Sequence, residues 1–191
     1  MIPKKIYTIW LAENGFLPDL VKKCMASQQI HGYEHHIIDL HNCYRNKYIQ
    51  DAIDAKQWTK ACDYLRCYYL IETGGIYLDA DIEMLPNKNF DDLLDSHIFA
   101  GKENNGFVNT AVMGAEKGCT LLVEHLKEVE SKFKGNDGKF FESSIELITP
   151  RLLKHGKVLA PEYFYPFDHQ RGTVDIKPYT ICYHYFMKSW K

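Results

Sequence analysis

The sequence predicts an α/β domain in which helices cover both faces of a central sheet. Short β-branched and aromatic segments alternate with longer segments of helical periodicity, and no repeat, low-complexity tract or linker divides the chain. The chain has 191 residues, of which 46% are hydrophobic, so it can bury one core without disulfide or metal support. We therefore expect a single domain spanning 1–191.

The first segments alternate between strand and helix. Residues 6–10 are β-branched and aromatic, and we expect them to form a buried first strand. A helix is predicted over 18–29, because proline suits the first turn of a helix and apolar residues recur at helical spacing. Residues 35–39 have the character of a second strand.

A helix and a strand follow in the middle of the chain with almost no connection between them. Residues 59–72 place apolar and aromatic side chains on or beside one helical face. Gly74 and Gly75 then end the helix, because glycine readily adopts the conformation that a helix terminus requires. The helix therefore runs directly into a short central strand at 76–78.

The second half is predicted to contain two more strands and two helices. Residues 97–101 and 107–113 are apolar and flank a polar turn, which is typical of strands. Helices are expected over 117–133 and 140–155, joined by residues 135–138. This continued alternation supports a sheet that is covered on both faces.

The final segment, 161–191, is aromatic and is predicted to be irregular. On general grounds its aromatic side chains would pack against an edge of the sheet, since such residues dominate core burial. The alternative is that its last part, 183–191, is a mobile lid that orders over a bound substrate.

Composition excludes several classes of function. The chain has 23 Lys and Arg against 25 Asp and Glu, with a net charge of -2, so it offers no broad basic surface for nucleic acid. No apolar segment approaches the roughly 20 residues of a membrane-spanning helix. The start of the chain lacks a signal-peptide pattern, so we expect a cytoplasmic protein.

Six cysteines are scattered through the chain without the spacing of a zinc site or a redox pair. Because free cysteine is commonly buried, we expect all six to be reduced thiols with structural roles. They are Cys24, Cys43, Cys62, Cys67, Cys119 and Cys182.

Two carboxylates follow the predicted central strand. Asp79 and Asp81 stand at i and i+2, so they point to the same side, into the crevice where α/β sheets bind ligands. Mg²⁺ and Mn²⁺ prefer carboxylate oxygens and complete their shells with phosphates and water. The pattern therefore predicts a cation site for a phosphorylated ligand, although two acidic residues in a loop are more often only solvated.

An acidic and a basic residue share a face of the preceding helix. Asp63 and Arg66 are three positions apart, and one interpretation is an ordinary ion pair worth a few tenths of a kcal/mol. In the functional interpretation, Arg66 holds phosphate oxygens and Asp63 accepts hydrogen bonds from sugar hydroxyls. The two interpretations are compatible.

Four segments carry a resemblance to a known family: 2–10, 61–66, 74–81 and the late His184 with Ser189-Trp190. With these segments in this order, the sequence resembles glycosyltransferase family 32, which shares a DXD sugar-binding region. That family includes bacterial capsular and lipooligosaccharide transferases and yeast initiating mannosyltransferases, and it is related to clostridial glucosylating toxins. The Gly-Gly-Ile-Tyr-Leu-Asp-x-Asp segment is the most specific of the four.

The resemblance implies a nucleotide-diphospho-sugar transferase fold of the A type, with a mixed, mainly parallel sheet. It divides the domain into a nucleotide-sugar-binding part (1–114), helices with the acceptor side (115–182) and a C-terminal lid (183–191). It also implies transfer of a hexose, with retained configuration, from a nucleotide sugar to a glycan or lipid-linked acceptor in surface polysaccharide synthesis. UDP is the favoured nucleotide, Mn²⁺ or Mg²⁺ the cofactor, and peripheral contact with the inner face of the membrane is compatible with such an acceptor.

The resemblance also assigns residues to the donor. Trp10 would stack on the nucleobase, and Asp63 and Arg66 would hold the donor sugar, with Arg66 also near the phosphates. Tyr77 and Asp79 would contact the ribose and the sugar. Each of these roles is an expectation that comes from the matching segments.

The metal and the far side of the donor are assigned in the same way. Asp81 would bind the metal together with Asp79, and His184 would complete the ligand set. Asn109 would lie near the donor sugar or the acceptor. The residues implied to close over the diphosphate are Ser189 and Trp190.

Two other functions stay open beside a transferase. One is a binding module for sugar nucleotides or glycans that has no turnover, which the intact pair of Asp63 and Arg66 disfavours. The other is a metal-dependent hydrolase of diphospho-sugars, which would need a base free to activate water. The sequence indicates neither the transferred sugar nor an oligomeric state.

Overall fold

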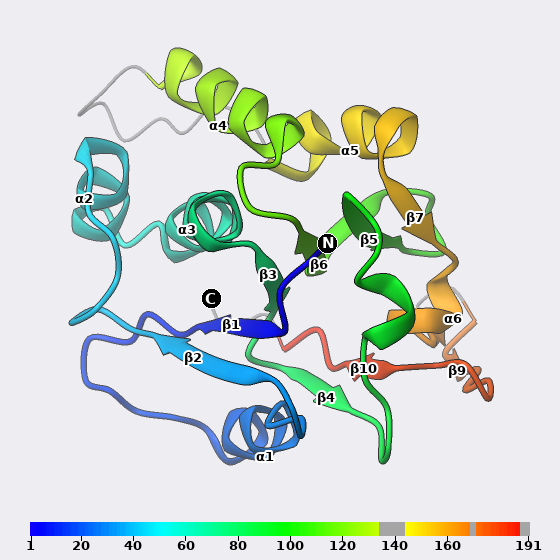
Figure 1. The fold of residues 1–191 in the computed structure, drawn as a ribbon. Helices are drawn as coiled ribbons and strands as arrows, with labels where there is room; N and C mark the ends of the chain where they lie inside the picture. Colours follow the sequence, from blue (N-terminus) through cyan, green and yellow to red (C-terminus); the bar gives the residue numbers. More distant parts are fainter. Residues whose placement is uncertain (134–143, 169–170, 188–191) are drawn as a thin grey trace.

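The computed structural model describes residues 1–133, 144–168 and 171–187. Its centre is a six-stranded sheet with the strand order β2-β1-β3-β6-β5-β7 (Figure 1). The strands are β1 (Lys5–Ile9), β2 (Glu34–Ile38), β3 (Gly75–Leu78), β5 (Ile98–Lys102), β6 (Val108–Ala115) and β7 (Lys157–Leu159). β1 pairs in parallel with β2 and β3, and β5 with β7, whereas β6 runs antiparallel to both β3 and β5. The predicted α/β class and the mixed, mainly parallel sheet are confirmed.

Helices cover one face of the sheet, and a helix with a two-stranded ribbon covers the other (Figure 1). The helices are α1 (Asp19–Ser27), α2 (Lys47–Asp54), α3 (Trp58–Thr73), α4 (Thr120–Lys132), α5 (Ser144–His155) and α6 (Pro161–Phe164), with a 3₁₀ turn η1 (Asp91–Leu93). The first face carries α2 to α5, and the second carries α1 and the ribbon of β4 (Ile82–Met84) and β10 (Cys182–His184). No helix in the described ranges is both long enough and apolar enough to cross a membrane.

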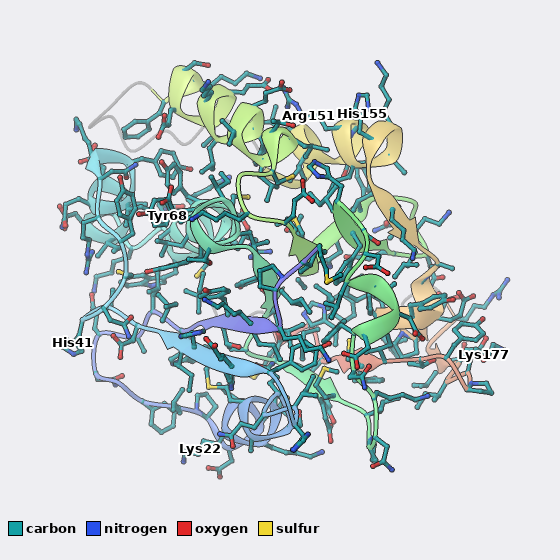
Figure 2. The ribbon with its side chains drawn as sticks, in the orientation of Figure 1. Lys22, His41, Tyr68, Arg151, His155 and Lys177 are labelled. Carbon is teal, nitrogen blue, oxygen red and sulfur yellow. The ribbon has the colours of Figure 1, made fainter. Side chains whose placement is uncertain are left out.

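Each face of the sheet has its own hydrophobic core. Under α3, Tyr7 and Ile9 of β1 pack with Leu65 and Leu70. On the other face, residues of β1, β3, β4 and β10 form a second cluster with aromatic residues from α6. Exposed side chains such as Lys22 and His41 lie at the outer edge of the molecule (Figure 2). Successive side chains of a strand point to opposite faces of the sheet, so the same strands contribute residues to both cores.

Two glycines allow α3 to turn directly into β3. Gly74 and Gly75 have φ angles of 68° and 134°, which residues other than glycine rarely adopt. A Cβ atom at Gly74 would stand 2.7 Å from the backbone nitrogen of Lys117 and 2.8 Å from Cδ of Pro3. The close approach of three segments at this turn therefore requires glycine.

Most predicted elements are present with boundaries that move by one to four residues, but the structure also contains elements that were not expected. α2 was not expected, although Asn46 caps it by accepting a hydrogen bond from the Ile49 backbone N–H at 2.8 Å. The tail is not irregular, because β10 pairs antiparallel with β4, and short strands β8 (Phe167–Asp168) and β9 (Thr173–Val174) pair with each other. The pairing of β10 with β4 joins segments that are distant in the sequence, which local sequence patterns do not reveal.

The predicted connection between the last two long helices and the predicted C-terminal lid involve residues that the structure does not fully describe. The predicted connection 135–138 lies outside the described ranges. The predicted lid, 183–191, begins with the last two residues of β10, and residues 188–191 lie outside the described ranges. The described part of that segment, through Met187, is docked by hydrogen bonds to Asp81.

We predict that Gly74→Ala destabilises the protein by more than about 2 kcal/mol, because backbone strain adds to contacts at 2.7–2.8 Å. Gly118→Ala is the matched control, since Gly118 also has a positive φ of 72° but has nothing within 4 Å of its Cβ position. Urea unfolding of both variants measures the difference. Equal losses would contradict the packing argument.

Candidate active site

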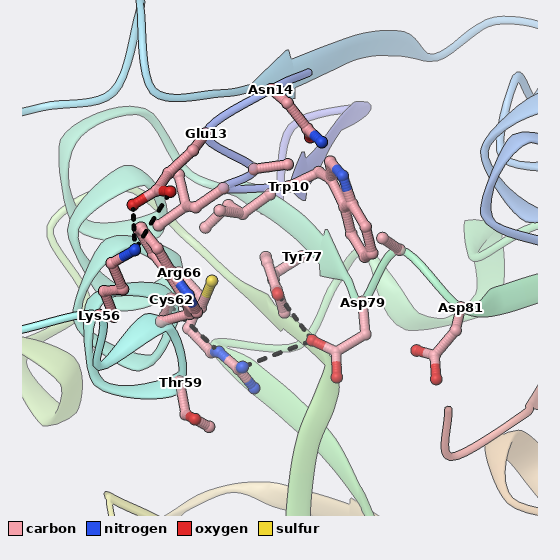
Figure 3. Close-up of a pocket in the computed structure, with 15 residues that line it drawn as sticks. Trp10, Glu13, Asn14, Lys56, Thr59, Cys62, Arg66, Tyr77, Asp79 and Asp81 are labelled. Atoms are coloured by element: carbon pink, nitrogen blue, oxygen red, sulfur yellow. Dashed lines mark hydrogen bonds and ion pairs between the residues drawn. The ribbon is translucent and has the colours of Figure 1, made fainter. Parts of the chain in front are cut away.

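A cavity of about 400 Å³ opens at the carboxyl ends of β1 and β3. One wall is the loop after β1, the opposite wall is the first half of α3, and the floor is the end of β3 (Figure 3). This is the position at which open α/β sheets bind ligands. The lining residues with polar or aromatic side chains are Trp10, Glu13, Asn14, Lys56, Trp58, Thr59, Cys62, Arg66, Tyr77, Asp79 and Asp81.

A buried guanidinium organises the floor of this cavity. Arg66 is only 7% exposed, and its Nη2 atom lies 3.1 Å from Asp63 Oδ1 and 3.4 Å from Asp79 Oδ1. Its Nη1 atom donates to Thr110 Oγ1 at 2.7 Å, and the guanidinium carbon lies 4.6 Å from the centre of the Tyr77 ring. One cation therefore joins the helix α3, the strand β6 and the acidic end of β3.

Burial and neighbouring charges act in opposite directions on this group. Burial alone would lower the pKa of Arg66, but Tyr77 and the carboxylates of Asp79 and Asp63 raise it above its ordinary value. Burial raises the pKa of Asp63, against the opposing effect of Arg66. Tyr77 donates its hydroxyl hydrogen to Asp79 Oδ1 at 2.6 Å, which fixes that carboxylate (Figure 3). Arg66 stays charged, and Asp79 is oriented from two sides.

Three potential metal ligands converge beside this cation. Donor atoms of Asp79, Asp81 and His184 all lie within 4.8 Å of one another. His184 Nε2 is 3.2 Å from Asp81 Oδ1 and 3.9 Å from Asp79 Oδ2. The β4–β10 pairing brings the histidine there, because His184 stands opposite Ile82 in the register. The predicted association of this late histidine with the Asp-x-Asp segment is thus present in the structure.

Asp81 is held by the tail as well as by the turn. The Met187 backbone N–H donates to Asp81 Oδ2 at 2.7 Å, and the Tyr185 N–H donates to the Asp81 carbonyl at 3.1 Å. Burial would raise the pKa of Asp81, but the hydrogen bonds from His184 and Met187 outweigh it and leave the pKa below its ordinary value. The carboxylate is therefore charged at neutral pH.

The donor set suits a hard divalent cation. Two carboxylates that lie this close repel each other, and a cation between them relieves the repulsion. Oxygen ligands are typical of Mg²⁺ and Mn²⁺, and the imidazole favours a transition ion such as Mn²⁺ over Mg²⁺. His184 Nδ1 is buried with no hydrogen-bond partner among the described residues, so its only polar contacts are toward the two carboxylates. The residues fit a divalent cation.

The indole of Trp10 forms part of the cavity wall near Asp79 (Figure 3). It is half-buried, packs against Val21, Met25 and Ala80, and donates from Nε1 to the Phe16 carbonyl at 2.9 Å. The ring is therefore held by its edge and by α1. A flat aromatic surface at a cavity wall can stack on another ring.

Other predicted residues lie apart from the cavity wall. Asp63 is not among the lining residues, and it forms an ion pair with Arg66 at 3.1 Å. Asn109 is buried on β6, where its Nδ2 atom donates to Glu103 Oε1 at 2.5 Å and its Oδ1 atom accepts from the Ala111 N–H at 2.8 Å. Ser189 and Trp190 lie outside the described residues.

All six cysteines are free thiols, and one of them lines the cavity. Cys62 is half-buried and lines the cavity, whereas the other five cysteines are buried. It stands four residues before Arg66 on α3, and this i, i+4 spacing was the available signal that both share the cavity face. Burial raises the pKa of Cys62 to about 12, so its thiol is neutral.

Several residues at the cavity mouth were not predicted from the sequence. Lys56 and Glu13 form an ion pair at 3.0 Å across the opening, and Trp58 and Thr59 stand beside it at the start of α3. Thr110 was also missed, although it is the hydroxyl that accepts from Arg66. No local pattern identifies these residues, because they come together only when the loop after β1 and the start of α3 meet.

The fold is that of the A-type glycosyltransferases. PaToxG glycosyltransferase has a TM-score of 0.57 at 16% identity, covering 80% of this chain and 69% of that one. The apo form of the glycosyltransferase GlyE from Streptococcus pneumoniae TIGR4 gives 0.60 at 12%, covering 98% and 55%, so this chain spans about half its length. A glycosyltransferase involved in glycosylation of the major capsid of PBCV-1 gives 0.51 at 14%, covering 94% and 92%. These likenesses concern the fold.

Residues 1–113 match the family described as capsular polysaccharide synthesis protein, which is more than half of the chain. The chain belongs to this family. Family and fold together support a glycosyltransferase. No curated protein matches the chain in sequence. The family is that of capsule synthesis, and assignment to family 32 stays a prediction.

We predict that Arg66→Met destabilises the protein by about 3–5 kcal/mol, because it leaves Asp63 and Asp79 without their buried counter-charge. Arg45→Met is the control, since Arg45 is exposed and donates to the Leu40 carbonyl. Chemical unfolding at pH 7 measures both. A loss below about 1 kcal/mol for Arg66→Met would show that the carboxylates do not depend on it.

Proposed function

We propose that the chain is a metal-dependent, configuration-retaining transferase that moves a hexose from a nucleoside-diphosphate sugar, with UDP favoured, to a glycan or lipid-linked acceptor. The observation that carries the proposal is the convergence of Asp79, Asp81 and His184 beside Arg66, at a cavity that Arg66 and the two aspartates line. The setting would be surface polysaccharide synthesis, in agreement with the family. We place the enzyme in the cytoplasm, at the inner face of the membrane.

The cavity can accommodate the parts of such a donor in order. The Trp10 indole offers a stacking surface for a nucleobase, and the acidic cluster with Arg66 lies at the floor. A volume of about 400 Å³ lies within the usual range for a ligand site. The Tyr77 hydroxyl and Asp79 would contact the ribose and the sugar, as the family 32 resemblance implies.

The charges of the site match the chemistry of a departing diphosphate. Asp79, Asp81 and His184 would hold the divalent cation, which when bound supplies positive charge to the diphosphate oxygens. Arg66 adds a fixed cation, and its position is already set by two carboxylates and Thr110. Because its orientation is set before substrate arrives, it can stabilise developing charge without reorganisation.

Retention without a covalent intermediate is the mechanism that these residues favour. Asp63 and Asp79 are engaged with Arg66, and Asp81 with His184 and the tail, so none of them is a free nucleophile. The acceptor hydroxyl would attack the anomeric carbon on the face from which the diphosphate leaves, and its proton would pass to a diphosphate oxygen. A glycosylated Asp or Glu trapped and found by mass spectrometry would contradict this route.

One experiment separates the transferase from the two alternatives. The protein is incubated with Mn²⁺ and a panel of UDP- and GDP-sugars, with and without acceptor glycans. Acceptor-stimulated release of nucleotide supports the transferase, and acceptor-independent release supports a hydrolase. Binding without release supports a module that only recognises the sugar nucleotide.

We predict that Trp10→Ala weakens UDP binding by roughly 5- to 150-fold, because base–aromatic stacking is worth about 1–3 kcal/mol. Trp10→Phe, which keeps a smaller aromatic face, is expected to retain most of the affinity. Isothermal titration with UDP and Mn²⁺ measures both variants. Unchanged affinity in Trp10→Ala would leave the indole with a packing role only.

We predict that activity requires a divalent cation, with Mn²⁺ preferred, and that Asp81→Asn lowers turnover at least 100-fold while the fold stays intact. The substitution removes one charged ligand and its share of the stabilisation of the leaving diphosphate. Asp92→Asn, at an exposed position, is the control. Turnover in excess EDTA equal to that with Mn²⁺ would refute the metal requirement.

A further inference from the structure

A fully buried glutamine lies behind the turn that carries the two metal-binding aspartates. Gln28 directly follows α1 and has no exposed surface. Its Nε2 atom donates to the Asp79 carbonyl at 2.9 Å and to the Ile82 carbonyl at 2.8 Å. The same turn is closed by the Ile82 N–H, which donates to the Asp79 carbonyl at 3.1 Å. One side chain therefore spans both ends of the Asp79-Ala80-Asp81-Ile82 turn.

The orientation of this amide is determined by its partners. Carbonyl oxygens only accept, so the nitrogen of the Gln28 amide must face them and the oxygen must face Thr8. The Thr8 hydroxyl, which is also fully buried, donates to Gln28 Oε1 at 2.6 Å. Because that hydroxyl has one hydrogen, His35 Nε2 at 2.9 Å from Thr8 Oγ1 must be a donor.

These bonds form a directed chain from β2 through β1 to the turn. His35 donates to Thr8, Thr8 donates to Gln28, and Gln28 donates to the backbone beneath Asp79. Hydrogen bonds in series polarise one another in a low-dielectric interior. Burying an amide side chain costs free energy, even when all of its hydrogen bonds are made. In this position the amide fixes the orientation of the turn, whereas an apolar residue would fill the same space without fixing it.

We propose that Gln28 is a positioning residue of the metal site: it holds the Asp79–Ile82 turn so that the two carboxylates point toward His184. The inference rests on the proposed function, because it assigns Gln28 a role toward the cation that Asp79, Asp81 and His184 would bind. Gln28 touches neither substrate nor metal. Its effect passes through the backbone of the turn.

The residue before Gln28, which is the last residue of α1, provides a matched control. Ser27 Oγ donates to the Cys24 carbonyl at 2.6 Å and accepts from the Met84 N–H at 2.9 Å. It also ties α1 to β4, but beyond the turn and away from both aspartates. Ser27→Ala therefore removes an anchoring bond between the same two elements without releasing the Asp79 carbonyl.

The test uses the full chain and Mn²⁺ alone as the probe. We expect Gln28→Met, which is close in volume, to weaken Mn²⁺ binding at least tenfold, since residues that orient metal ligands typically contribute 10- to 100-fold to affinity. At saturating Mn²⁺, kcat should fall while the KM for the donor changes little. Hydrogen exchange at the Ile82 amide should accelerate without metal present.

Ser27→Ala should leave Mn²⁺ affinity and kcat within twofold of wild type, even where its melting temperature falls as much as that of Gln28→Met. Mn²⁺ affinity in Gln28→Met equal to that of Ser27→Ala would overturn the positioning role.

If Gln28→Met does not fold, Thr8→Val replaces it, because it removes only the hydroxyl that orients Gln28. Thr8→Val should weaken Mn²⁺ about threefold or more, and wild-type affinity in that variant would also overturn the role. A wild-type protein that binds no Mn²⁺ would instead contradict the proposed function, and this inference with it.

Discussion

The buried ion pair of Arg66 with Asp63 and Asp79 is the constraint on which the rest of the site depends. A charge that is 7% exposed is stable only when its partners are held in place, and here the partners come from α3 and the end of β3. Thr110 on β6 adds a third element. Satisfying one guanidinium therefore sets the distances between a helix and two strands, and the cavity floor follows from those distances.

Hydrogen bonds and ion pairs hold the acidic turn after β3 from three sides. They keep the carboxylates of Asp79 and Asp81 close to each other. Tyr77 and Arg66 orient Asp79 from the cavity side, the tail holds Asp81, and Gln28 holds the backbone from behind. Without such support, two like charges would move apart into solvent. The positions of both carboxylates are thus fixed before any ligand is present, which is what electrostatic preorganisation requires.

The parts of the site that could be predicted share one property, which is that they are local in sequence. Asp79 and Asp81 follow a strand at i and i+2, and Asp63 and Arg66 share a helix face, so strand and helix periodicity sufficed. His184 was connected to them only through a family resemblance. Gln28 carried no signal, because a glutamine just after a helix is ordinarily exposed and the two carbonyls to which it donates lie more than 50 residues away.

The sequence by itself determined the fold class, the order of most strands and helices, and the two pairs of charged residues, since all of these follow from short-range periodicity and turn chemistry. Only the tertiary structure decided that β10 returns beside β4, that Cys62 faces the cavity, and that Arg66 has two carboxylate partners instead of one. The physical reason is that pairing between distant strands and burial of charge depend on which surfaces meet. The contacts between these surfaces depend on the fold of the whole chain, and they leave no periodic pattern in the sequence.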